Sequence, residues 1–389
     1  MKRQVYLDYN ATTPLHPEVL DAMLPFLQDT FGNPSSAHWA GRLARTAVNR
    51  ARKQVAELLH CDPDEVIFTS CATESNNTAI KGVAATLRSK GNHIITTRVE
   101  HPAVLYPCLY LENFGYQVTC LDVDAEGMLD LDALEAAITD KTILISAMFA
   151  NNETGTIFPV REIAEIAARH RVYFHCDAVQ AVGKIPLDLQ DLKVDMLSLS
   201  GHKLYAPKGI GALILRKGTK LYPYLHGGKQ EKNRRAGTEN VAGIVALGKA
   251  CEIAGRSMAT ESSRLQKLRD RLEMEIMERI PHVRRNGHPT LRIPNTSNVT
   301  FLSIEPELLV SALDREGIAI SSGSACSSGA LRSSPVIAAM GNDWSHAESH
   351  IRFSFGRSNT EEDVDYVLTV LPKVVQKLRE TSGLNTMAM

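Results

Sequence analysis

The chain has 389 residues and a mass of 42.7 kDa, more than the roughly 100 to 200 residues of one ordinary domain, which predicts two domains sharing an interface. Lys and Arg number 43 against 44 Asp and Glu, and this net charge of -1 disfavours binding to nucleic acid or an anionic membrane. A hydrophobic content of 44% and a charged content of 22% exclude a disordered, collagen-like or coiled-coil chain.

Short β-rich runs alternate with longer amphipathic runs from about residue 65 onwards. Strands are predicted at 66–70, 93–97, 117–121, 142–148, 172–176 and 196–200, with helical segments between the first five. This alternation is typical of βαβ units and predicts a mainly parallel sheet with helices on both faces. A long helix at about 240–280 then leads to a smaller α+β region, with strands and helices in turn at 298–303, 305–316, 318–321, 351–355 and 361–379.

The cysteines and the N-terminal residues indicate the cellular compartment. The seven cysteines are an odd number without any Cys-x-x-Cys spacing, which indicates reduced thiols rather than a disulfide frame or a zinc site. The basic pair Lys2 and Arg3 is not followed by the apolar run of a signal peptide, and no stretch of about 18 apolar residues occurs. We therefore expect a cytoplasmic protein with no membrane partner.

Familiar nucleotide and metal motifs are absent from the sequence. Residues 209–211 have the Gly-x-Gly start of a dinucleotide fingerprint but lack its third glycine. The Gly-Lys pairs at 183–184 and 248–249 are not followed by Ser or Thr, as a P-loop requires, and His-Glu-x-x-His does not occur. The usual support for a dehydrogenase, an NTPase or a zinc protease is missing.

Polar groups suited to a phosphorylated aldehyde cofactor follow successive predicted strands, where ligands of such sheets bind. Lys203 can form a Schiff base, and Asp177, one residue beyond its strand, can pair with a pyridinium nitrogen. Thr73 precedes the helical run 74–89, where a phosphate can bind, and His101 can stack on a ring or move protons. Each has an ordinary alternative: a turn lysine, helix N-caps for Asp177 and Thr73, and a structural histidine. Their joint position favours a pyridoxal-phosphate enzyme.

Cys326 lies in a Ser- and Gly-rich segment, whose composition predicts flexibility. A cysteine in such a segment is normally an oxidation liability, so its presence needs a reason. About six residues on either side allow the thiol to travel on the order of 20 Å. The segment is therefore predicted to carry the thiol between a buried cofactor and a second protein; the alternative is a flexible connection with an incidental cysteine.

Nine motifs spread over nearly the whole chain resemble those of the cysteine desulfurases. They occupy residues 6–14, 31–36, 69–75, 100–102, 151–155, 175–180, 200–203, 234–240 and 321–329. The uninterrupted cysteine segment is similar to that of the group containing NifS and IscS, rather than to the shorter segment of the SufS-like group. Gly-His-Lys-Leu-Tyr-Ala-Pro-Lys at 201–208 and Thr-Ser-Cys at 69–71 are more similar to NifS proteins.

This resemblance implies the pyridoxal-phosphate-dependent aspartate-aminotransferase-like fold, called fold type I, in a homodimer. Its large α/β domain, at 14–255, has a mainly parallel seven-stranded sheet. Its small α+β domain, at 256–389, carries the cysteine segment 321–333, and residues 1–13 pack on it.

The resemblance also implies roles for individual residues. Lys203 forms the Schiff base with pyridoxal phosphate and moves the Cα proton, Asp177 pairs with the pyridinium, and Gln180 bonds the ring oxygen. His101 stacks on the ring and acts as acid or base, including toward the Cys326 thiol. Asn152 and Arg352 receive the substrate, and Asn152 also contacts the cofactor. The remaining cofactor-binding residues hold the phosphate end: Ala72, Thr73, Ser200, Gly201, His202 and Thr238 of the partner subunit.

The implied activity is removal of sulfur from L-cysteine to give L-alanine and a persulfide on Cys326. The sulfur then goes to an iron–sulfur scaffold protein, with Cys326 as a transient cluster ligand, and the NifS-like features point to nitrogenase cluster assembly. Three alternatives stay open: a housekeeping IscS-like donor, a pyridoxal-phosphate lyase, transaminase or selenocysteine lyase using the same site, and a sulfur carrier with little turnover.

Overall fold

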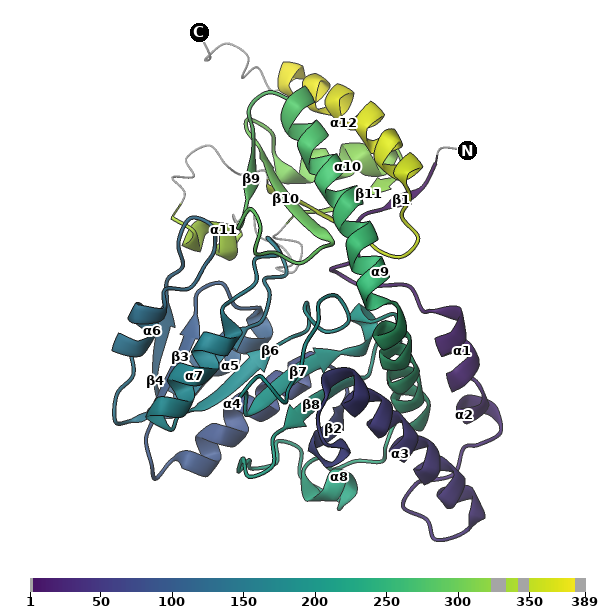
Figure 1. The fold of residues 1–389 in the computed structure, drawn as a ribbon, viewed down its shortest axis with the longest axis vertical. Coiled ribbons are helices and arrows are strands. Elements are labelled where there is room, and N and C mark those ends of the chain that lie inside the picture. The colour runs from purple at the N-terminus through teal and green to yellow at the C-terminus, as the bar shows by residue number, and fades with distance from the viewer. Residues whose placement is uncertain (1–2, 323–333, 342–349, 382–389) are drawn as a thin grey trace.

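The structure is a computed structural model that describes residues 3–322, 334–341 and 350–381. The two larger of the three β-sheets formed by the described residues pack on separate hydrophobic cores and are joined by one long helix, α9 (Val241–Arg279) (Figure 1). Cys326 lies outside the described residues, as does nearly all of the predicted cysteine segment. No helix within the described ranges is long and apolar enough to cross a membrane.

The larger sheet has seven strands in the order β2-β8-β7-β6-β5-β3-β4. Only β8 runs antiparallel to its neighbours, so the prediction of a mainly parallel sheet is confirmed. Its strands are β2 (Val66–Thr69), β3 (His93–Thr97), β4 (Gln117–Leu121), β5 (Thr142–Met148), β6 (Tyr173–Asp177), β7 (Met196–Ser200) and β8 (Gly211–Leu215). The prediction for β6 was one residue early, so Asp177 is the last residue of the strand and not the residue after it.

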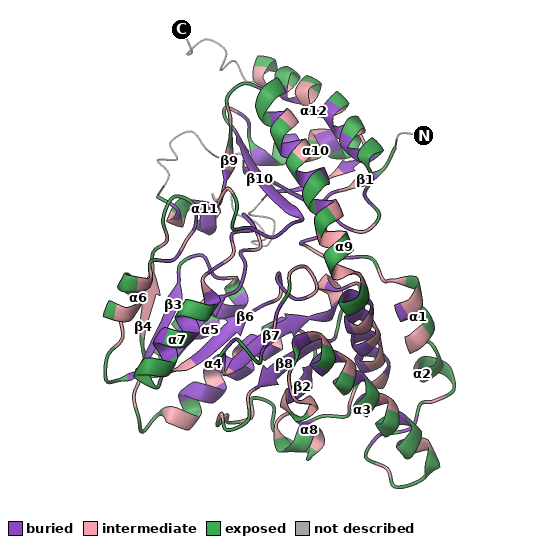
Figure 2. Ribbon diagram, in the orientation of Figure 1, coloured by how far each residue is buried: buried purple, intermediate pink, exposed green. Residues whose placement is uncertain are grey.

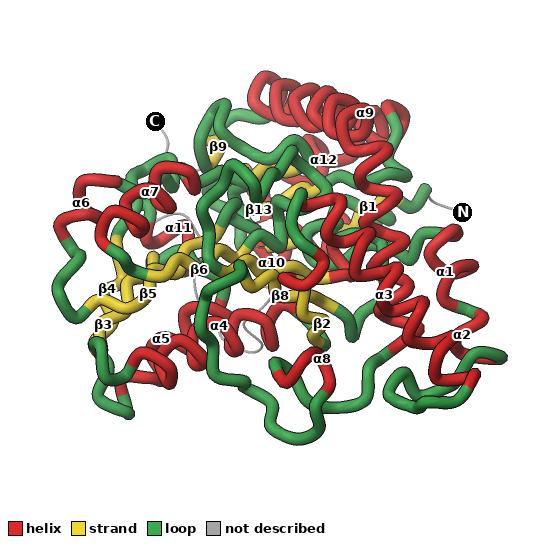
Figure 3. Tube along the Cα trace, turned by 60° about the horizontal axis from the view of Figure 1, so that its bottom comes forward, coloured by secondary structure: helices red, strands yellow, loops and turns green. Residues whose placement is uncertain are grey.

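Helices cover both faces of this sheet because successive strand side chains point to opposite sides. Ile67 packs into the core beneath α4 (Ala72–Leu87) and α5 (Pro102–Glu112), whereas Phe68 packs into the core of α3 (Trp39–Leu59), α7 (Val160–His170) and α9. Figure 3 shows the strands between these helix layers, and Figure 2 shows the buried strands beneath helices with exposed outer surfaces. The shorter helices of this part are α1 (Pro17–Met23), α2 (Pro25–Gln28), η1 (Pro63–Glu65), α6 (Leu131–Ala136), η2 (Gly201–Lys203) and α8 (Gln230–Asn233).

The smaller sheet is antiparallel, in the order β12-β13-β10-β9, and packs against the second half of α9. Buried residues of α9 up to Ala254 belong to the large core and those from Leu265 onwards to the small one, so this helix contributes to both. The elements here are β9 (Val283–Asn286), β10 (Thr296–Phe301), α10 (Pro306–Arg315), β11 (Ile318–Ala319), β12 (Ser321–Ser322), α11 (Pro335–Ala339), β13 (His350–Ser354) and α12 (Glu361–Thr381).

The N-terminal residues connect the two cores. Strand β1 (Val5–Tyr6) pairs in parallel with β11, and Val5 and Leu7 are buried in the small core. The chain then crosses to the large sheet: the Asn10 N–H donates to Ser354 Oγ at 3.0 Å, and the Thr13 N–H donates to the His202 carbonyl at 3.0 Å. Residues 8–13 therefore lie at the seam between the sheets, while the domain boundaries at 14 and 255 stay predictions.

Candidate active site

A cavity of about 290 Å³ lies at the carboxyl ends of the parallel strands. Most of its walls come from residues that follow β2, β5, β6 and β7, and Arg352 enters from β13 of the other sheet. The predicted site residues that line it are Ala72, Thr73, His101, Asn152, Asp177, Gln180, Ser200, His202, Lys203 and Arg352. The fold therefore brings together side chains as far apart in the sequence as Ala72 and Arg352.

Two of the predicted site residues that the structure describes do not line this cavity. Gly201 is buried at the start of η2, next to residues that do. Thr238 lines a separate cavity together with Ser70 and Gly209. Cys326, and with it the predicted metal role of its thiol, lies outside the described residues. The described residues contain no cluster of three or more His, Cys, Asp or Glu that could hold a metal ion.

Lys203 is fixed at the wall of the cavity by the N-terminal segment. Its Nζ donates to the backbone carbonyl of Asn10 and, at 2.7 Å, to that of Ala11. The residue is half-buried and follows β7 directly through η2, so it is not the exposed turn lysine of the ordinary alternative. A primary amine is thereby presented at the end of the strand where an aldehyde can reach it.

The Asp177 carboxylate is buried and oriented by two hydrogen bonds. Its Oδ2 accepts from Asn76 Nδ2 at 2.7 Å, and its Oδ1 accepts from the Val179 N–H at 3.1 Å. Asp177 also lines the cavity, so its carboxylate is placed to meet a ligand there. Sequence reasoning missed Asn76; its place one turn after Ala72 and Thr73 in α4 was the available signal.

His101 caps the N-terminus of α5 with its side chain. Its Nδ1 accepts from the Ala103 N–H at 3.0 Å, so a neutral ring carries its proton on Nε2. Burial lowers the pKa of His101; the Lys203 charge lowers it further, and the Asp177 charge opposes both. The neutral ring is therefore a hydrogen donor at Nε2, and acting as a base there requires moving the proton to Nδ1 at the expense of the cap.

The first turn of α4 also lines the cavity, through Ala72 and Thr73. Cys71 occupies the N-cap position and Thr73 lies within the first turn, so the N-cap interpretation of Thr73 is wrong. Helix N-termini attract anions because their N–H groups carry partial positive charge. Ser200 and His202 stand nearby on the wall, and burial, with Lys203 and Lys208, lowers the pKa of His202 to about 4.

Arg352 is anchored by the residues around it. Its Nη2 donates to Asp8 Oδ1 at 2.8 Å, and its Nη1 donates to the Asn152 carbonyl at 2.9 Å. Its Nε is buried and has no partner among the described residues, although the residue is only 5% exposed. Arg352 lines the cavity, and a guanidinium there is suited to a carboxylate ligand.

Glu100 is a buried carboxyl group to which sequence reasoning assigned no role. Its Oε1 accepts from Thr97 Oγ1 and from the Met148 N–H, both at 2.9 Å, while its Oε2 has no partner among the described residues. Burial, reinforced by the nearby Asp177 charge, raises the pKa of Glu100 to about 8. The group is therefore protonated at neutral pH.

The Glu100→Gln substitution is expected to flatten the pH dependence of stability. Because the folded pKa of Glu100 lies above the unfolded value, this carboxyl group stabilises the wild-type fold below the unfolded pKa, and the stabilisation is lost as pH rises to about 8. Because Gln stays neutral, the free energy of unfolding of the variant should not fall in this way. Relative to the wild type, it should rise by a few kcal/mol between pH 5 and pH 8. Urea unfolding at both pH values measures this, with exposed Glu112→Gln as the control. Parallel profiles of Glu100→Gln and wild type would contradict it.

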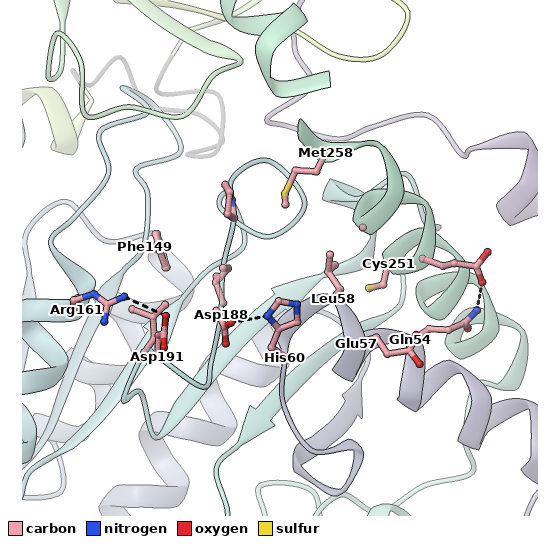
Figure 4. Close-up of a pocket in the computed structure, with 15 residues that line it drawn as sticks. Gln54, Glu57, Leu58, His60, Phe149, Arg161, Asp188, Asp191, Cys251 and Met258 are labelled. Atoms are coloured by element: carbon pink, nitrogen blue, oxygen red, sulfur yellow. Dashed lines mark hydrogen bonds and ion pairs between the residues drawn. The ribbon is translucent and has the colours of Figure 1, made fainter. Parts of the chain in front are cut away.

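A larger cavity of about 720 Å³ lies elsewhere, between the end of α3, α9 and residues 186–192 (Figure 4). None of the predicted site residues lines it. Two ion pairs occupy part of its lining, His60 with Asp188 at 2.7 Å and Arg161 with Asp191 at 3.9 Å. The smaller cavity therefore remains the candidate active site.

Comparison with known proteins agrees with this geometry. The family model described as aminotransferase class-V matches residues 5–367. The cysteine desulfurase IscS of Dictyoglomus turgidum is 53% identical over 382 residues, covering 98% of this chain and 97% of that protein. This chain belongs to the cysteine desulfurases. Two solved structures share the fold. One is a NifS-like protein with a TM-score of 0.91 and 39% identity, covering 97% of this chain and all of that one. The other is SspA in complex with cysteine, with a TM-score of 0.80 and 37% identity, covering 91% of this chain and 99% of that one.

Cysteine desulfurases of this family depend on pyridoxal phosphate, and the cavity fits that cofactor. It offers a primary amine at Lys203, a buried carboxylate at Asp177, and the N-terminus of α4. These groups suit an aldehyde, a pyridinium and a phosphate, respectively. The predicted fold type, enzyme class and cofactor are confirmed.

Proposed function

We propose that this desulfurase transfers the sulfur of L-cysteine to Cys326, forming a persulfide and releasing L-alanine. The observation that carries the proposal is a single cavity lined by Lys203, which follows a strand of the large sheet, and by Arg352 from the small sheet. SspA, a solved relative, has been determined in complex with cysteine.

The proposed chemistry uses few side chains of this chain. Bound pyridoxal phosphate supplies an electron-withdrawing ring that stabilises negative charge at the substrate Cα. Lys203 takes the Cα proton and returns a proton to Cα after the sulfur has left, and Asp177 holds the ring nitrogen protonated. The Cys326 thiolate bonds to the substrate sulfur, the C–S bond breaks, and its electron pair takes a proton to complete the methyl group of alanine. His101, which presents Nε2–H in its neutral form, is the proposed donor of that proton.

Cys326 is proposed as the acceptor because both described flanks of its segment adjoin the substrate residues. Ser321 is paired with Arg352 across the antiparallel strands β12 and β13. On the other side, Ser334 Oγ donates to Glu153 Oε2 at 2.6 Å, and Glu153 follows Asn152 directly. The described residues on either side of 323–333 therefore lie next to Arg352 and Asn152.

Arg352 is proposed to bind the substrate carboxylate. Arg352→Lys keeps the positive charge but removes the planar fork, and with it the second hydrogen bond to a carboxylate. Loss of one charged hydrogen bond is expected to lower kcat/KM about tenfold to hundredfold, mainly through KM. Steady-state kinetics with L-cysteine measure it. An unchanged KM in the folded variant would assign carboxylate binding to another residue.

We also propose that two copies of this chain form the active enzyme. Exposed aromatic side chains gather beside the cavity opening on α5 and the segment after β8: Tyr106, Tyr110, Phe114, Tyr222 and Tyr224. Thr73 and His101 line the same open surface as Tyr106 and Tyr110. A second copy covering this surface would bury apolar area, and its Thr238, which lies outside its own cavity, is the proposed phosphate ligand from across the interface.

The proposed destination of the sulfur is iron–sulfur cluster assembly in the cytoplasm, through a scaffold protein that receives the persulfide and a cluster to which Cys326 is a transient ligand. The relative from Dictyoglomus turgidum is named IscS, which favours general supply, whereas the motifs at 69–71 and 201–208 favour service to nitrogenase. Deleting the gene and comparing growth on ammonium with growth on dinitrogen separates the two: a defect confined to dinitrogen supports the nitrogenase role.

The decisive experiment exposes the purified holoenzyme to L-cysteine without a reductant. We expect one alanine per sulfur retained and a mass gain of one sulfur atom on the peptide that contains Cys326. A keto acid product in place of alanine, or sulfur on a different cysteine, would overturn the proposal.

A further inference from the structure

Lys184 is a half-buried lysine to which the proposed chemistry assigns no role. It lies in the turn after β6 and, together with Lys203, lines a small cavity next to the candidate active site. Burial, with the charges of Lys203 and Arg352, lowers the pKa of Lys184 well below its usual value. No carboxylate within the described ranges forms an ion pair with it, and enclosing an unpaired amine is unfavourable.

The hydrogen bonds of Lys184 go to two amide oxygens of the site. Its Nζ donates to Oε1 of Gln180, four residues earlier in the sequence, and to Asn10 Oδ1 at 3.0 Å. Gly183 permits this approach, because it has a φ of +73° and a Cβ there would lie 2.2 Å from Leu204 Cδ2, beside Lys203.

An amide side chain has two unlike ends, and a donor at one end decides which way it faces. With Lys184 at Oε1, Gln180 turns its Nε2 to the other side, where it donates to the Asn10 carbonyl at 3.1 Å. The same carbonyl accepts from Lys203 Nζ. The donor end of Gln180 therefore faces the amine that holds the cofactor.

We propose that Lys184 is a positioning residue that fixes the Gln180 amide with its N–H group toward the cofactor ring. The inference rests on the proposed contact between Gln180 and the ring oxygen. Without Lys184 the amide can turn its Oε1 to that side, and an acceptor facing an anionic ring oxygen repels it. Lys184 acts in this way through Gln180, without touching substrate or cofactor.

A double-mutant cycle on cofactor binding tests this proposal. Apoprotein is titrated with pyridoxal phosphate, following its visible absorbance band and the dissociation constant, for wild type, Lys184→Met, Gln180→Ala and the double variant. We expect Lys184→Met to weaken binding about tenfold and shift the band, as loss of a charged hydrogen bond predicts. The double variant should match Gln180→Ala, because residues that act through one another are not additive.

Controls separate this role from a purely structural one and from failure of the Gln180 contact. The exposed Lys193→Met substitution should leave both readouts unchanged. If Lys184→Met does not fold, Lys184→Gln, which keeps a donor without the charge, takes its place in the cycle. Additive losses, or a Lys184 variant with wild-type affinity and absorbance, would overturn the inference. A Gln180→Ala variant with wild-type affinity would instead overturn the contact on which it rests.

Discussion

Replacement of Lys203 by alanine is expected to abolish alanine formation from L-cysteine. The amine is the only described lysine nitrogen held on the carbonyls of Asn10 and Ala11 at the end of β7, and the variant loses both covalent attachment and proton transfer. Proton transfer by a positioned side chain alone contributes about 10²- to 10⁴-fold, so the rate should fall at least about 10³-fold. The measurement is alanine release at saturating cysteine and cofactor.

Lys208→Ala is the matched control, since that lysine is exposed and lies five residues further along the same segment. Borohydride reduction of the wild-type holoenzyme should leave the cofactor attached to the peptide containing Lys203. Attachment to Lys184 instead, or a Lys203→Ala variant with more than a tenth of wild-type activity, would contradict the assignment.

Replacement of Cys326 by alanine should stop sulfur transfer while leaving substrate binding intact. The lost thiol is the proposed acceptor, whereas Lys203 and Arg352 remain in place to bind cofactor and cysteine. Sulfide release in the presence of a reductant should fall at least about 100-fold, because the thiolate that attacks the substrate sulfur is lost. The absorbance change on adding cysteine should persist.

Cys120→Ala serves as the control because its half-buried thiol lies on the edge strand β4, away from the cavity. Cys71 offers an internal check, since it is a described cysteine that lines the cavity itself. Full sulfide release by Cys326→Ala, or a persulfide found on Cys71, would assign the acceptor role elsewhere.

The predicted strand ends were close to those of the structure because strands of a buried parallel sheet are short apolar runs that end in polar residues. Lys203, His101 and Asp177 were found from that pattern, with Asp177 displaced by one residue. The pattern did not reveal β8, whose five buried residues follow a turn rather than a predicted helix, and which alone runs antiparallel. Nor did it reveal α3.

The sequence by itself determined which functional groups the site contains: an amine, a carboxylate and a helix N-terminus. Local periodicity placed each of them at the end of a strand. Only the tertiary structure decided how these groups are held. The Asp8–Arg352 pair and the Asn10 contacts with Lys184 and Lys203 join residues far apart in the chain. Such contacts leave no local periodicity, since they exist only where β1 pairs with β11 and α9 brings the two sheets together across one cavity.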